Sequence, residues 1–401
     1  MEIKMDIISE LNGKRILIWG YGREGKATEH FLQRCVKPAS VDIFEGKKEE
    51  IDEDDYDFII KSPGIVMNEE NPKYTSETEL FLQQFRDQVI GITGTKGKST
   101  TSAMLYTVLK ACSSRPVLLL GNIGQPCLDY FEEVTEDTII VYEMSCHQLA
   151  HTNVSPHIAI FLNLYEEHLD YYGTVEKYFE AKSHIAAYQK SGDYFFVGEN
   201  VPQIDTKAQR TVLHQPKDVH YELKLAGEHN QYDAQFVERV AELLGCEKEA
   251  VLKSMADFEG LPHRLQYVGT YRGVRYYDDS ISTIPEAAIN AAMSIPDAKT
   301  VLIGGMDRGI NYDLLVAFIR EHKEFQFICA YASGKRIFGE VGDCENCVYA
   351  EDLEQAVEAA VQMTEPGGAC ILSPAAASYG YFKNFEERGE TFQKYVHAFA
   401  Q

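Results

Sequence analysis

The residues with the clearest chemical meaning lie in one glycine-rich stretch, Gly-Thr-Lys-Gly-Lys-Ser-Thr, which begins at Gly94. Glycines at Gly94 and Gly97 allow backbone N–H groups to close around phosphate oxygens, and Lys98 adds a positive charge. The hydroxyl group of Ser99 or Thr100 could hold Mg²⁺. The stretch therefore predicts a phosphate-binding loop.

The spacing of this loop differs from that of a strict Walker A motif. Position 92, five residues before the second glycine of the loop, is Ile where Walker A has Gly. A strand-like segment at 87–90 precedes the loop and a helix-like segment at 102–110 follows it. This strand–loop–helix setting favours phosphate binding over an ordinary glycine turn. The variant spacing also reduces the number of nucleotide-binding enzyme classes to which the chain could belong.

Further candidate ligands follow other predicted strands. Asn122, Glu143 and Asn163 each lie at or just beyond the carboxyl end of an apolar segment, where open α/β sheets bind their ligands. Glu143 and His168 could share a divalent cation, because Mg²⁺ takes few protein ligands and keeps water and phosphate oxygens. Spacing alone favours an ordinary surface or core histidine over a metal ligand at His168. Lys182 follows fourteen residues later in a helix-like run.

A second glycine turn occurs near the start of the chain. The apolar segment 14–20 leads into Gly20-Tyr-Gly-Arg-Glu-Gly25, and a helix-like run 26–34 and a strand-like run 41–44 follow. Asp42 lies in the latter, as in a Rossmann-like βαβ unit. An NAD-dependent oxidoreductase would fit this turn but would leave the second glycine loop unexplained.

The alternation of strand and helix patterns predicts an α/β protein with three α/β domains. We expect a Rossmann-like domain at 1–88, a P-loop-type ATPase domain at 89–259 and a second Rossmann-like domain at 260–401. The apolar segments that would form strands in the two later domains are 117–124, 138–143, 158–163, 274–279, 300–305, 325–330 and 368–373.

Composition limits the possible functions. The 38 Lys and Arg residues against 62 Asp and Glu give a net charge of −24, which disfavours a general nucleic-acid binder. An anionic substrate would therefore need a locally basic pocket. The chain has no apolar run long enough to span a membrane and no signal-peptide pattern, so we expect a cytoplasmic protein without membrane insertion. The lone Cys344-x-x-Cys347 pair is a weak zinc or redox signal.

An ordered set of motifs extends over nearly the whole chain and resembles the Mur ligase family, the ATP-dependent amide-bond-forming enzymes of peptidoglycan precursor synthesis. The set comprises Gly94 to Thr100, Gly121-Asn-Ile-Gly124, Glu143 to Leu149, Asn163 to Asp170, Gly227-Glu-His-Asn230, Leu261-Pro-His-Arg264, Tyr277-Asp-Asp-Ser280 and Leu372 to Ser378. Gly20 to Gly25, Lys61 to Ile65 and Ser378 to Gly389 are most similar to the branch of the family that adds D-glutamate.

The resemblance implies ATP and Mg²⁺ as cofactors, UDP-N-acetylmuramoyl-L-alanine and D-glutamate as substrates, and a monomer. Matched by motif, ATP would be held by Gly94, Thr95, Lys96, Gly97, Lys98, Ser99, Thr100, Asn230, Arg264 and Asp279. Magnesium would be held by Ser99, Glu143, His168 and a carbamylated Lys182. The uridine substrate would contact Gly22, Arg23, Asp42, Ser62, Pro63, Gly64 and Asn122, and D-glutamate would contact Thr283, Arg308, Ser378 and Phe385. Lys98, Lys182, His168 and Arg264 would serve catalysis.

This assignment agrees with the chemistry of amide formation. Phosphorylation of a carboxylate creates a good leaving group, and the transfer needs positive charge of the kind that Lys98 and Arg264 supply. The amine of the incoming amino acid then attacks the acyl phosphate. Closure of the site would exclude the water that hydrolyses this intermediate.

Three features depart from the family pattern. Ile281 stands where Lys commonly follows Asp-Ser, and Arg308 stands where Lys is common. Residues 191–226 are few, which indicates a trimmed central domain. The first two leave open a ligase for another amino acid, of the Mur or folylpolyglutamate type. A non-catalytic nucleotide-binding protein of the same fold is a further alternative, which the retained Lys98 and Glu143 disfavour.

Overall fold

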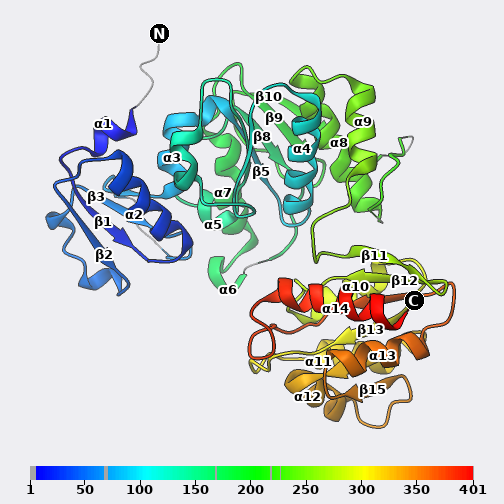
Figure 1. The fold of residues 1–401 in the computed structure, drawn as a ribbon. Helices are drawn as coiled ribbons and strands as arrows, with labels where there is room; N and C mark the ends of the chain where they lie inside the picture. Colours follow the sequence, from blue (N-terminus) through cyan, green and yellow to red (C-terminus); the bar gives the residue numbers. More distant parts are fainter. Residues whose placement is uncertain (1–5, 67–70, 168, 217–218, 226, 401) are drawn as a thin grey trace. The chain divides into compact units, whose positions relative to one another are not determined.

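The computed structural model describes residues 6–66, 71–167, 169–216, 219–225 and 227–400. Three sheets, mostly parallel and interleaved with helices, confirm the predicted α/β class (Figure 1). The chain divides into two compact units, one of residues 1–222 with 229–256 and one of residues 223–228 with 257–401. The first unit contains the N-terminal and central sheets, and the second contains the third sheet. The predicted domain boundaries at 88/89 and 259/260 stay predictions.

The N-terminal sheet has the strand order β2-β1-β3-β4, and all its strands are parallel. Four of the five residues of its apolar strand β1 are buried. The turn after β1 leads into α2, and it needs glycine at position 25, where a Cβ atom would lie 2.2 Å from the carbonyl oxygen of Gly20. The elements of this region are α1 (Ile7–Leu11), β1 (Arg15–Trp19), α2 (Arg23–Cys35), β2 (Ser40–Phe44), η1 (Lys48–Glu50), η2 (Glu53–Asp55), β3 (Phe58–Lys61), β4 (Tyr74–Thr75), α3 (Glu77–Phe85) and η3 (Arg86–Gln88).

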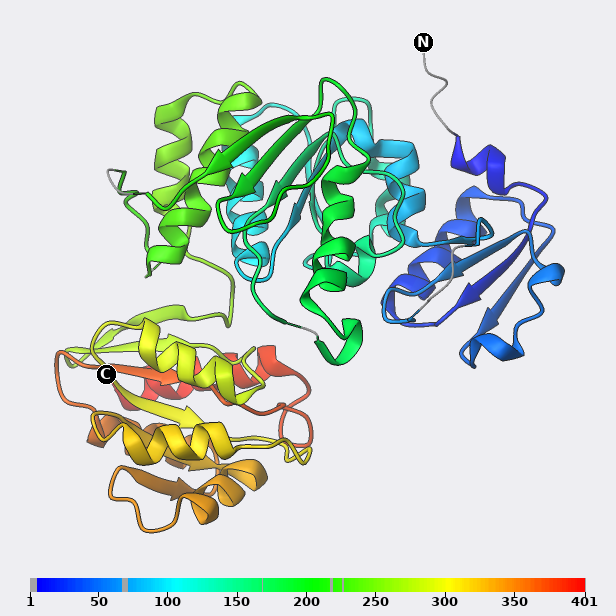
Figure 2. The same ribbon diagram turned by 180° about the vertical axis from the view of Figure 1, so that it is seen from behind.

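The central sheet has the order β10-β9-β8-β5-β7-β6, again with all strands parallel. Strand β5 is buried along its whole length, as expected for a strand covered on both faces. Helices α4 and α7 pack against it from opposite sides of the sheet (Figures 1 and 2). The strands are β5 (Val89–Thr93), β6 (Val117–Gly121), β7 (Ile139–Glu143), β8 (Ile158–Phe161), β9 (Tyr194–Gly198) and β10 (Gln209–Leu213). The helices are α4 (Lys98–Cys112), η4 (Cys127–Glu133), α5 (Cys146–Leu149), α6 (Leu169–Tyr172), α7 (Val175–Ala187), α8 (Glu228–Leu243) and α9 (Lys248–Asp257).

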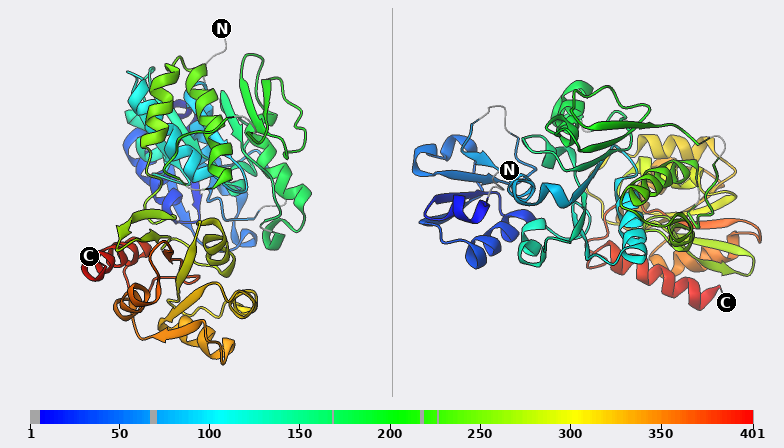
Figure 3. Two further views of the ribbon diagram at one scale, coloured as in Figure 1. Left: turned by 90° about the vertical axis from the view of Figure 1, so that its right-hand side faces the viewer. Right: turned by 90° about the horizontal axis from the view of Figure 1, so that it is seen from above.

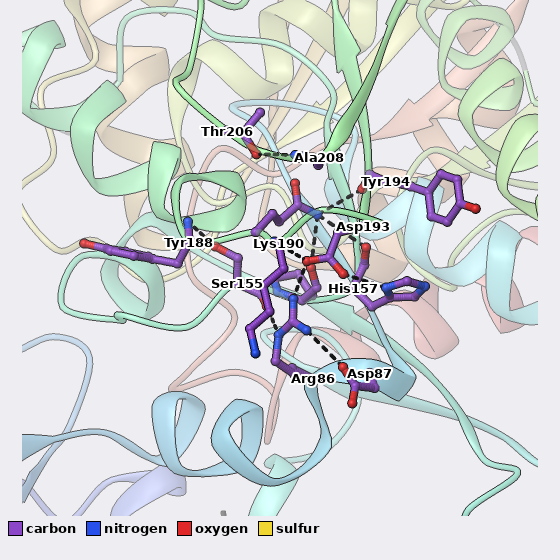
Figure 4. A network of polar contacts seen from close by, with 12 residues as sticks. Arg86, Asp87, Ser155, His157, Tyr188, Lys190, Asp193, Tyr194, Thr206 and Ala208 are labelled. Carbon is purple, nitrogen blue, oxygen red and sulfur yellow. Dashed lines mark hydrogen bonds and ion pairs between the residues drawn. The ribbon is translucent and has the colours of Figure 1, made fainter. Parts of the chain in front are cut away.

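The amino end of this sheet is held by a polar network around Asp193 (Figure 4). The carboxylate of Asp193 accepts hydrogen bonds from Arg86 Nη2 and from the backbone N–H of Lys190, and its Oδ1 lies 2.7 Å from His157 Nδ1. Arg86 Nε also donates to the carbonyl oxygen of Ser155 at 2.9 Å. The network ties together the segments that lead into β5, β8 and β9.

The second unit contains one sheet of order β11-β12-β16-β13-β14-β15, in which only the β11–β12 pair is antiparallel. Alternate residues of β13 face opposite sides. Val301 and Ile303 pack in the cluster of α10, α11 and α12, and Leu302 packs with α13 and α14, which Figure 3 shows on the two sides of the sheet. The elements are β11 (Gln266–Tyr271), β12 (Val274–Asp278), α10 (Pro285–Ser294), β13 (Ala298–Ile303), α11 (Asp313–Glu321), β14 (Gln326–Ala330), α12 (Tyr331–Val341), β15 (Cys347–Ala350), α13 (Leu353–Met363), β16 (Ala369–Leu372) and α14 (Phe385–Phe399).

Two elements differ from the pattern that the sequence predicts. Helix α4 begins at Lys98, four residues before the helix-like run at 102, so the candidate phosphate ligands lie in its first turn. The short segment 191–226 holds the strands β9 and β10. Among the helices within the described ranges, none is long and apolar enough to cross a membrane.

Candidate functional site

The phosphate-binding loop connects the carboxyl end of β5 with the amino end of α4. Gly97 caps the helix in the left-handed region, with φ 84°, which disfavours any residue with a Cβ atom. A Cβ atom at this position would also lie 2.3 Å from Oδ2 of Asp233. Both constraints bring the backbone N–H groups of the first turn of α4 to the place where an anion would bind.

Asn163, just beyond β8, fixes the conformation of the loop. Its Oδ1 accepts a hydrogen bond from the backbone N–H of Lys96 at 2.9 Å, and its Nδ2 donates to the carbonyl oxygen of Lys96 at 3.1 Å. The backbone N–H of Thr95 donates to the carbonyl oxygen of Asn163 at 2.9 Å. The sequence places Asn163 at a strand end but gives no sign of this positioning role.

Two lysines converge on the carbonyl oxygen of Gly94. Lys98 Nζ donates to it at 2.9 Å and to the carbonyl oxygen of Thr95 at 3.0 Å. Lys182 Nζ, from α7, donates to it at 2.8 Å and to Oγ1 of Thr93 at 3.3 Å. Burial lowers the pKa of Lys98. Burial, and then the nearby charge of Lys98, lowers the pKa of Lys182 to about 7, so its amine loses its proton near neutral pH.

Glu143 ends β7 and is fully buried. Its Oε1 accepts a hydrogen bond from Asn122 Nδ2 at 2.7 Å. Its Oε2 has no hydrogen-bond partner among the residues that the structure describes. A buried carboxylate oxygen without a donor is costly unless a cation or ligand meets it, so Glu143 fits the predicted magnesium site.

Ser99 and His168 are the other unmodified side chains predicted to bind magnesium. Ser99 lies in the first turn of α4, at the phosphate loop. His168 lies outside the described residues. Within the described ranges, no group of three His, Cys, Asp or Glu side chains could hold a metal ion. A magnesium site here therefore depends on Glu143 together with donors such as a hydroxyl, a modified lysine and phosphate oxygens.

Helix α8 carries the predicted adenine ligand Asn230 in its first turn, where the side chain is buried. One turn later the same helix places Asp233 against Gly97. Burial raises the pKa of Asp233 to about 8, and the nearby hydroxyl group of Thr101 opposes the shift. The sequence alone does not indicate a role for Asp233, although its spacing of three residues from Asn230 puts both on one helix face.

The predicted uridine-substrate residues gather partly around a cavity of about 180 Å³ in the first unit. Arg23 and Asn122 both line it, although one begins α2 and the other follows β6. Arg23 Nη2 donates to the carbonyl oxygen of Gly124 at 2.9 Å. Of the remaining predicted contacts, Gly22 caps α2, Ser62, Pro63 and Gly64 follow β3, and Asp42 lies exposed in β2, outside the lining of the cavity.

In the second unit, Asp279 is almost completely buried after β12. It accepts hydrogen bonds from Ser282 Oγ and Ser373 Oγ at 2.5 and 2.8 Å and from the backbone N–H of Leu265 at 3.1 Å. Burial raises the pKa of Asp279 to about 6, and these hydrogen bonds and the charge of Arg264 oppose the shift. Arg264 itself is exposed.

The predicted D-glutamate residues lie on loops that Arg388 holds together. This arginine is 1% exposed and donates to the carbonyl oxygens of Ser280 and Ala376, at 2.7 and 3.0 Å. Ser280 Oγ donates to the carbonyl oxygen of Phe385 at 2.8 Å. No motif in the sequence marks Arg388 for this positioning role.

The backbone hydrogen bond from Met306 to Ala377, at 2.8 Å, brings the loop of Arg308 beside that of Ser378. Arg308 is exposed, and Thr283 and Ile281 are half-buried.

The comparisons with known proteins agree with this geometry. Residues 92–242 match the family model described as Mur ligase middle domain. A UDP-N-acetylmuramoylalanine–D-glutamate ligase from Geobacillus kaustophilus is 31% identical, over 98% of this chain and 94% of the relative. The chain belongs to the Mur ligase family. An enzyme of the same name from Aquifex aeolicus is 30% identical, over 95% of this chain and 98% of its own length.

Solved structures of Mur ligases share the fold. The MurF ligase from Thermotoga maritima in complex with ADP has a TM-score of 0.58 and 18% identity, covering 97% of this chain and 96% of that one. The UDP-N-acetylmuramate-alanine ligase MurC from the same organism has a TM-score of 0.59 and 18% identity, with 96% and 99% covered. The predicted fold and family are confirmed, and the roles of the individual Mur ligase site residues stay predictions.

Proposed function

We propose that this chain is an ATP-dependent ligase that joins D-glutamate to UDP-N-acetylmuramoyl-L-alanine through an acyl-phosphate intermediate. The near-full-length likeness to ligases of that name supports the choice of substrates. The observation that carries the chemistry is the edge of the central sheet. There the buried Lys182 and the half-buried Lys98 meet at Gly94, and Glu143 offers an unpartnered carboxylate oxygen within the described part of the chain.

ATP binding would begin at the phosphate loop. The backbone N–H groups of the first turn of α4 bind phosphate oxygens, and Lys98 exchanges its hydrogen bonds to loop carbonyls for the phosphates. Asn163 keeps the loop in this shape without a change of backbone. Magnesium, held by Ser99, Glu143, His168 and modified Lys182, would supply positive charge at the transferring phosphoryl group.

Lys182 is suited to the modification that the family resemblance implies. Its amine is buried, and a pKa of about 7 leaves a substantial neutral fraction at neutral pH. The neutral nitrogen can attack CO₂, forming an N–C bond and releasing one proton, which converts an amine into an anionic carbamate. The carbamate is an oxygen ligand of the kind that Mg²⁺ prefers.

The second half-reaction needs the incoming amino acid to be held by its carboxylates. Thr283, Ser378 and the backbone at Phe385 offer hydroxyl and N–H donors, and Arg308 offers a planar guanidinium that binds a carboxylate with two hydrogen bonds. Ile281 cannot donate a hydrogen bond, unlike the lysine that is common at this position. Arg308 therefore has to supply more of the binding energy for the carboxylates of D-glutamate. The free amine of D-glutamate attacks the acyl carbon, and inorganic phosphate leaves.

The test is phosphate release from ATP, Mg²⁺ and UDP-N-acetylmuramoyl-L-alanine, with D-Glu, L-Glu, Lys or Gly offered in turn. We expect release only with D-Glu and a product that carries one added glutamate by mass. Equal release with every amino acid, or with none added, would contradict the proposal. Release that depends on Lys would instead favour a different acceptor.

A further inference from the structure

Two glutamates outside the predicted site meet in the cavity of the first unit. Glu24 lies in the first turn of α2, and Glu77 is the first residue of α3. Glu24 Oε1 accepts a hydrogen bond from Gln148 Nε2 at 2.8 Å, and Glu77 Oε1 accepts one from the backbone N–H of Leu128 at 2.9 Å. Glu24 Oε2 is buried and has no donor among the residues that the structure describes.

Glu24 and Glu77 line the same cavity, and each carboxyl group lies close enough to affect the titration of the other. Burial raises the pKa of Glu24, and burial and then the charge of Glu24 raise the pKa of Glu77. Two neighbouring carboxyl groups whose pKa values are both raised by burial do not readily ionise together, so we expect the pair to titrate as a unit that keeps one proton.

The charged and titratable groups that face the pair do not remove this proton. Lys61 is a buried cation whose charge acts on Glu24, but burial lowers its own pKa to about 8 and its Nζ donates to the carbonyl oxygen of Ile65. The other groups that act on the pair are Arg23, Cys127, Asp129 and Tyr142. Only Arg23 among these is a cation, and it lies at the exposed rim of the cavity.

The cavity connects this pair with the candidate phosphate site. Glu24, Glu77, Arg23, Asn122 and Gln148 all line its volume of about 180 Å³. Asn122 in turn donates to Glu143. A group bound in the cavity is therefore one side chain away from the carboxylate that fits magnesium.

We propose that the Glu24–Glu77 pair positions a secondary amide of the UDP-linked substrate in this cavity, by donating to its carbonyl oxygen and accepting from its N–H. This inference rests on the proposed function. A proton-sharing carboxyl pair offers one donor and one acceptor, which an amide complements and a substrate carboxylate does not, because a carboxylate would meet like charge. Glu24 and Glu77 are positioning residues in this scheme, since the reacting carboxylate lies elsewhere on the substrate.

The substrate contains two secondary amides, one in the acetamido group and one in the lactyl-alanine linkage. UDP-N-acetylmuramic acid has the acetamido group and lacks the lactyl-alanine amide. Its binding to the variants therefore shows which of the two amides the Glu24–Glu77 pair contacts. If the pair holds the acetamido group, Glu24→Ala weakens binding of both compounds. If it holds the alanyl amide, Glu24→Ala weakens binding of UDP-N-acetylmuramoyl-L-alanine alone.

The first experiment is calorimetric titration of both UDP compounds and of ATP over a range of pH. The proteins are the wild type, Glu24→Gln, Glu24→Ala and the exposed control Glu133→Gln on η4. We expect wild-type affinity for UDP-N-acetylmuramoyl-L-alanine to fall as the pH rises through the raised pKa of the pair. Glu24→Gln keeps a donor and an acceptor, so it binds within a few-fold of wild type and loses this pH dependence. Glu24→Ala weakens binding about tenfold at every pH and leaves ATP affinity unchanged.

Two results would overturn the inference: Glu24→Ala binding both UDP compounds as tightly as the wild type, or Glu24→Gln keeping the full pH dependence. The infrared C=O band of a protonated carboxylic acid, present in the unliganded wild type and lost in Glu24→Gln, tests the shared proton without substrate. If the UDP compound binds as expected but no phosphate is released when D-Glu is added, the proposed function is wrong and the proposed role of the Glu24–Glu77 pair is retained. If Glu24→Ala catalyses ligation with a wild-type KM for the UDP compound, the proposed role of the Glu24–Glu77 pair is wrong and the proposed function is retained.

Discussion

The two ends of the central sheet hold buried charges in opposite ways. At the amino end, the carboxylate of Asp193 is matched by Arg86, by His157 and by a backbone N–H (Figure 4). At the carboxyl end, Glu143 keeps one oxygen without a partner among the described residues. Lys182 donates to a carbonyl and a hydroxyl, and no carboxylate accepts a hydrogen bond from it within the described ranges.

The difference indicates that the buried charges at the amino end of the central sheet serve stability, whereas those at its carboxyl end serve function. Charges that are satisfied within the fold stabilise it, whereas buried polar atoms left without partners cost free energy and persist where a ligand supplies the match. The amino end should therefore respond to substitution through stability and the carboxyl end through activity.

The largest effect is expected from Lys182→Ala. Removal of the amine removes the carbamate and with it a magnesium ligand, so we expect ligase turnover to fall by about 10³-fold with little change in melting temperature. Bicarbonate or another small carboxylate, added to the assay, should restore part of the activity by occupying the vacated space. Lys177→Ala, at an exposed position of the same helix, is the control and should keep wild-type turnover. Full activity in Lys182→Ala would show that no carbamate is needed.

Glu143→Gln should have the next largest effect. The amide retains an oxygen for Asn122 but removes the negative charge that magnesium needs, so we expect turnover to fall by about 10²-fold and the magnesium requirement to rise. Stability should stay the same or increase, because the substitution removes an unpartnered buried carboxylate. Turnover over a magnesium titration, together with a melting curve, measures both effects. A large loss of stability in Glu143→Gln would show that Glu143 stabilises the fold, as Asp193 does, and would contradict its assignment to the magnesium site.

The sequence predicts the parts of this site that are local. The glycine loop, its lysine and the polar residues at strand ends can be recognised because each depends on neighbours in the chain. The predicted strands include neither β9 nor β10. Strand β10 is an edge strand whose first three residues are exposed, so it lacks an apolar pattern. The start of α4 was placed late because Ser and Thr have modest helix propensity, and the left-handed cap at Gly97 could not be recognised.

The residues that the sequence did not reveal act through contacts between distant segments. Arg388 reads as an ordinary exposed arginine on α14, and only the fold shows that it is buried against the loops at Ser280 and Ala376. Asp233 reads as a polar helix position, and only the packing of α8 brings it to Gly97. Burial of a charged side chain is a tertiary property, so a single sequence does not indicate it.

Asp193→Asn tests the amino end. Arg86 loses its buried partner, and hydrogen bonds to a charged group contribute about 2 kcal/mol, so amide exchange in β8 and β9 should become about 30-fold faster. Turnover at saturating substrates should stay near wild type, because no atom of the network lies at the phosphate loop. Asp87→Asn is a matched control: Asp87 pairs with the same arginine but is exposed, and its loss should change exchange very little. A loss of turnover in Asp193→Asn without faster exchange would refute the division between the two ends.

The smallest effect is a pH dependence of the same network. Burial alone would raise the pKa of Asp193, but hydrogen bonds from His157 and Lys190 and the charge of Arg86 outweigh it and hold the pKa below its ordinary value of 3.8. A carboxyl with a lowered pKa in the folded state stabilises the fold above its unfolded pKa and loses that contribution as the pH falls through the folded value. The exchange difference between wild type and Asp193→Asn should therefore be constant from pH 7 to about 5 and shrink below about 4, because protonated Asp193 resembles asparagine. Protection factors for β9 peptides, corrected for the intrinsic exchange rate at each pH, measure it. A difference that persists unchanged at pH 3 would mean that hydrogen bonding, and not the charge of Asp193, stabilises the amino end.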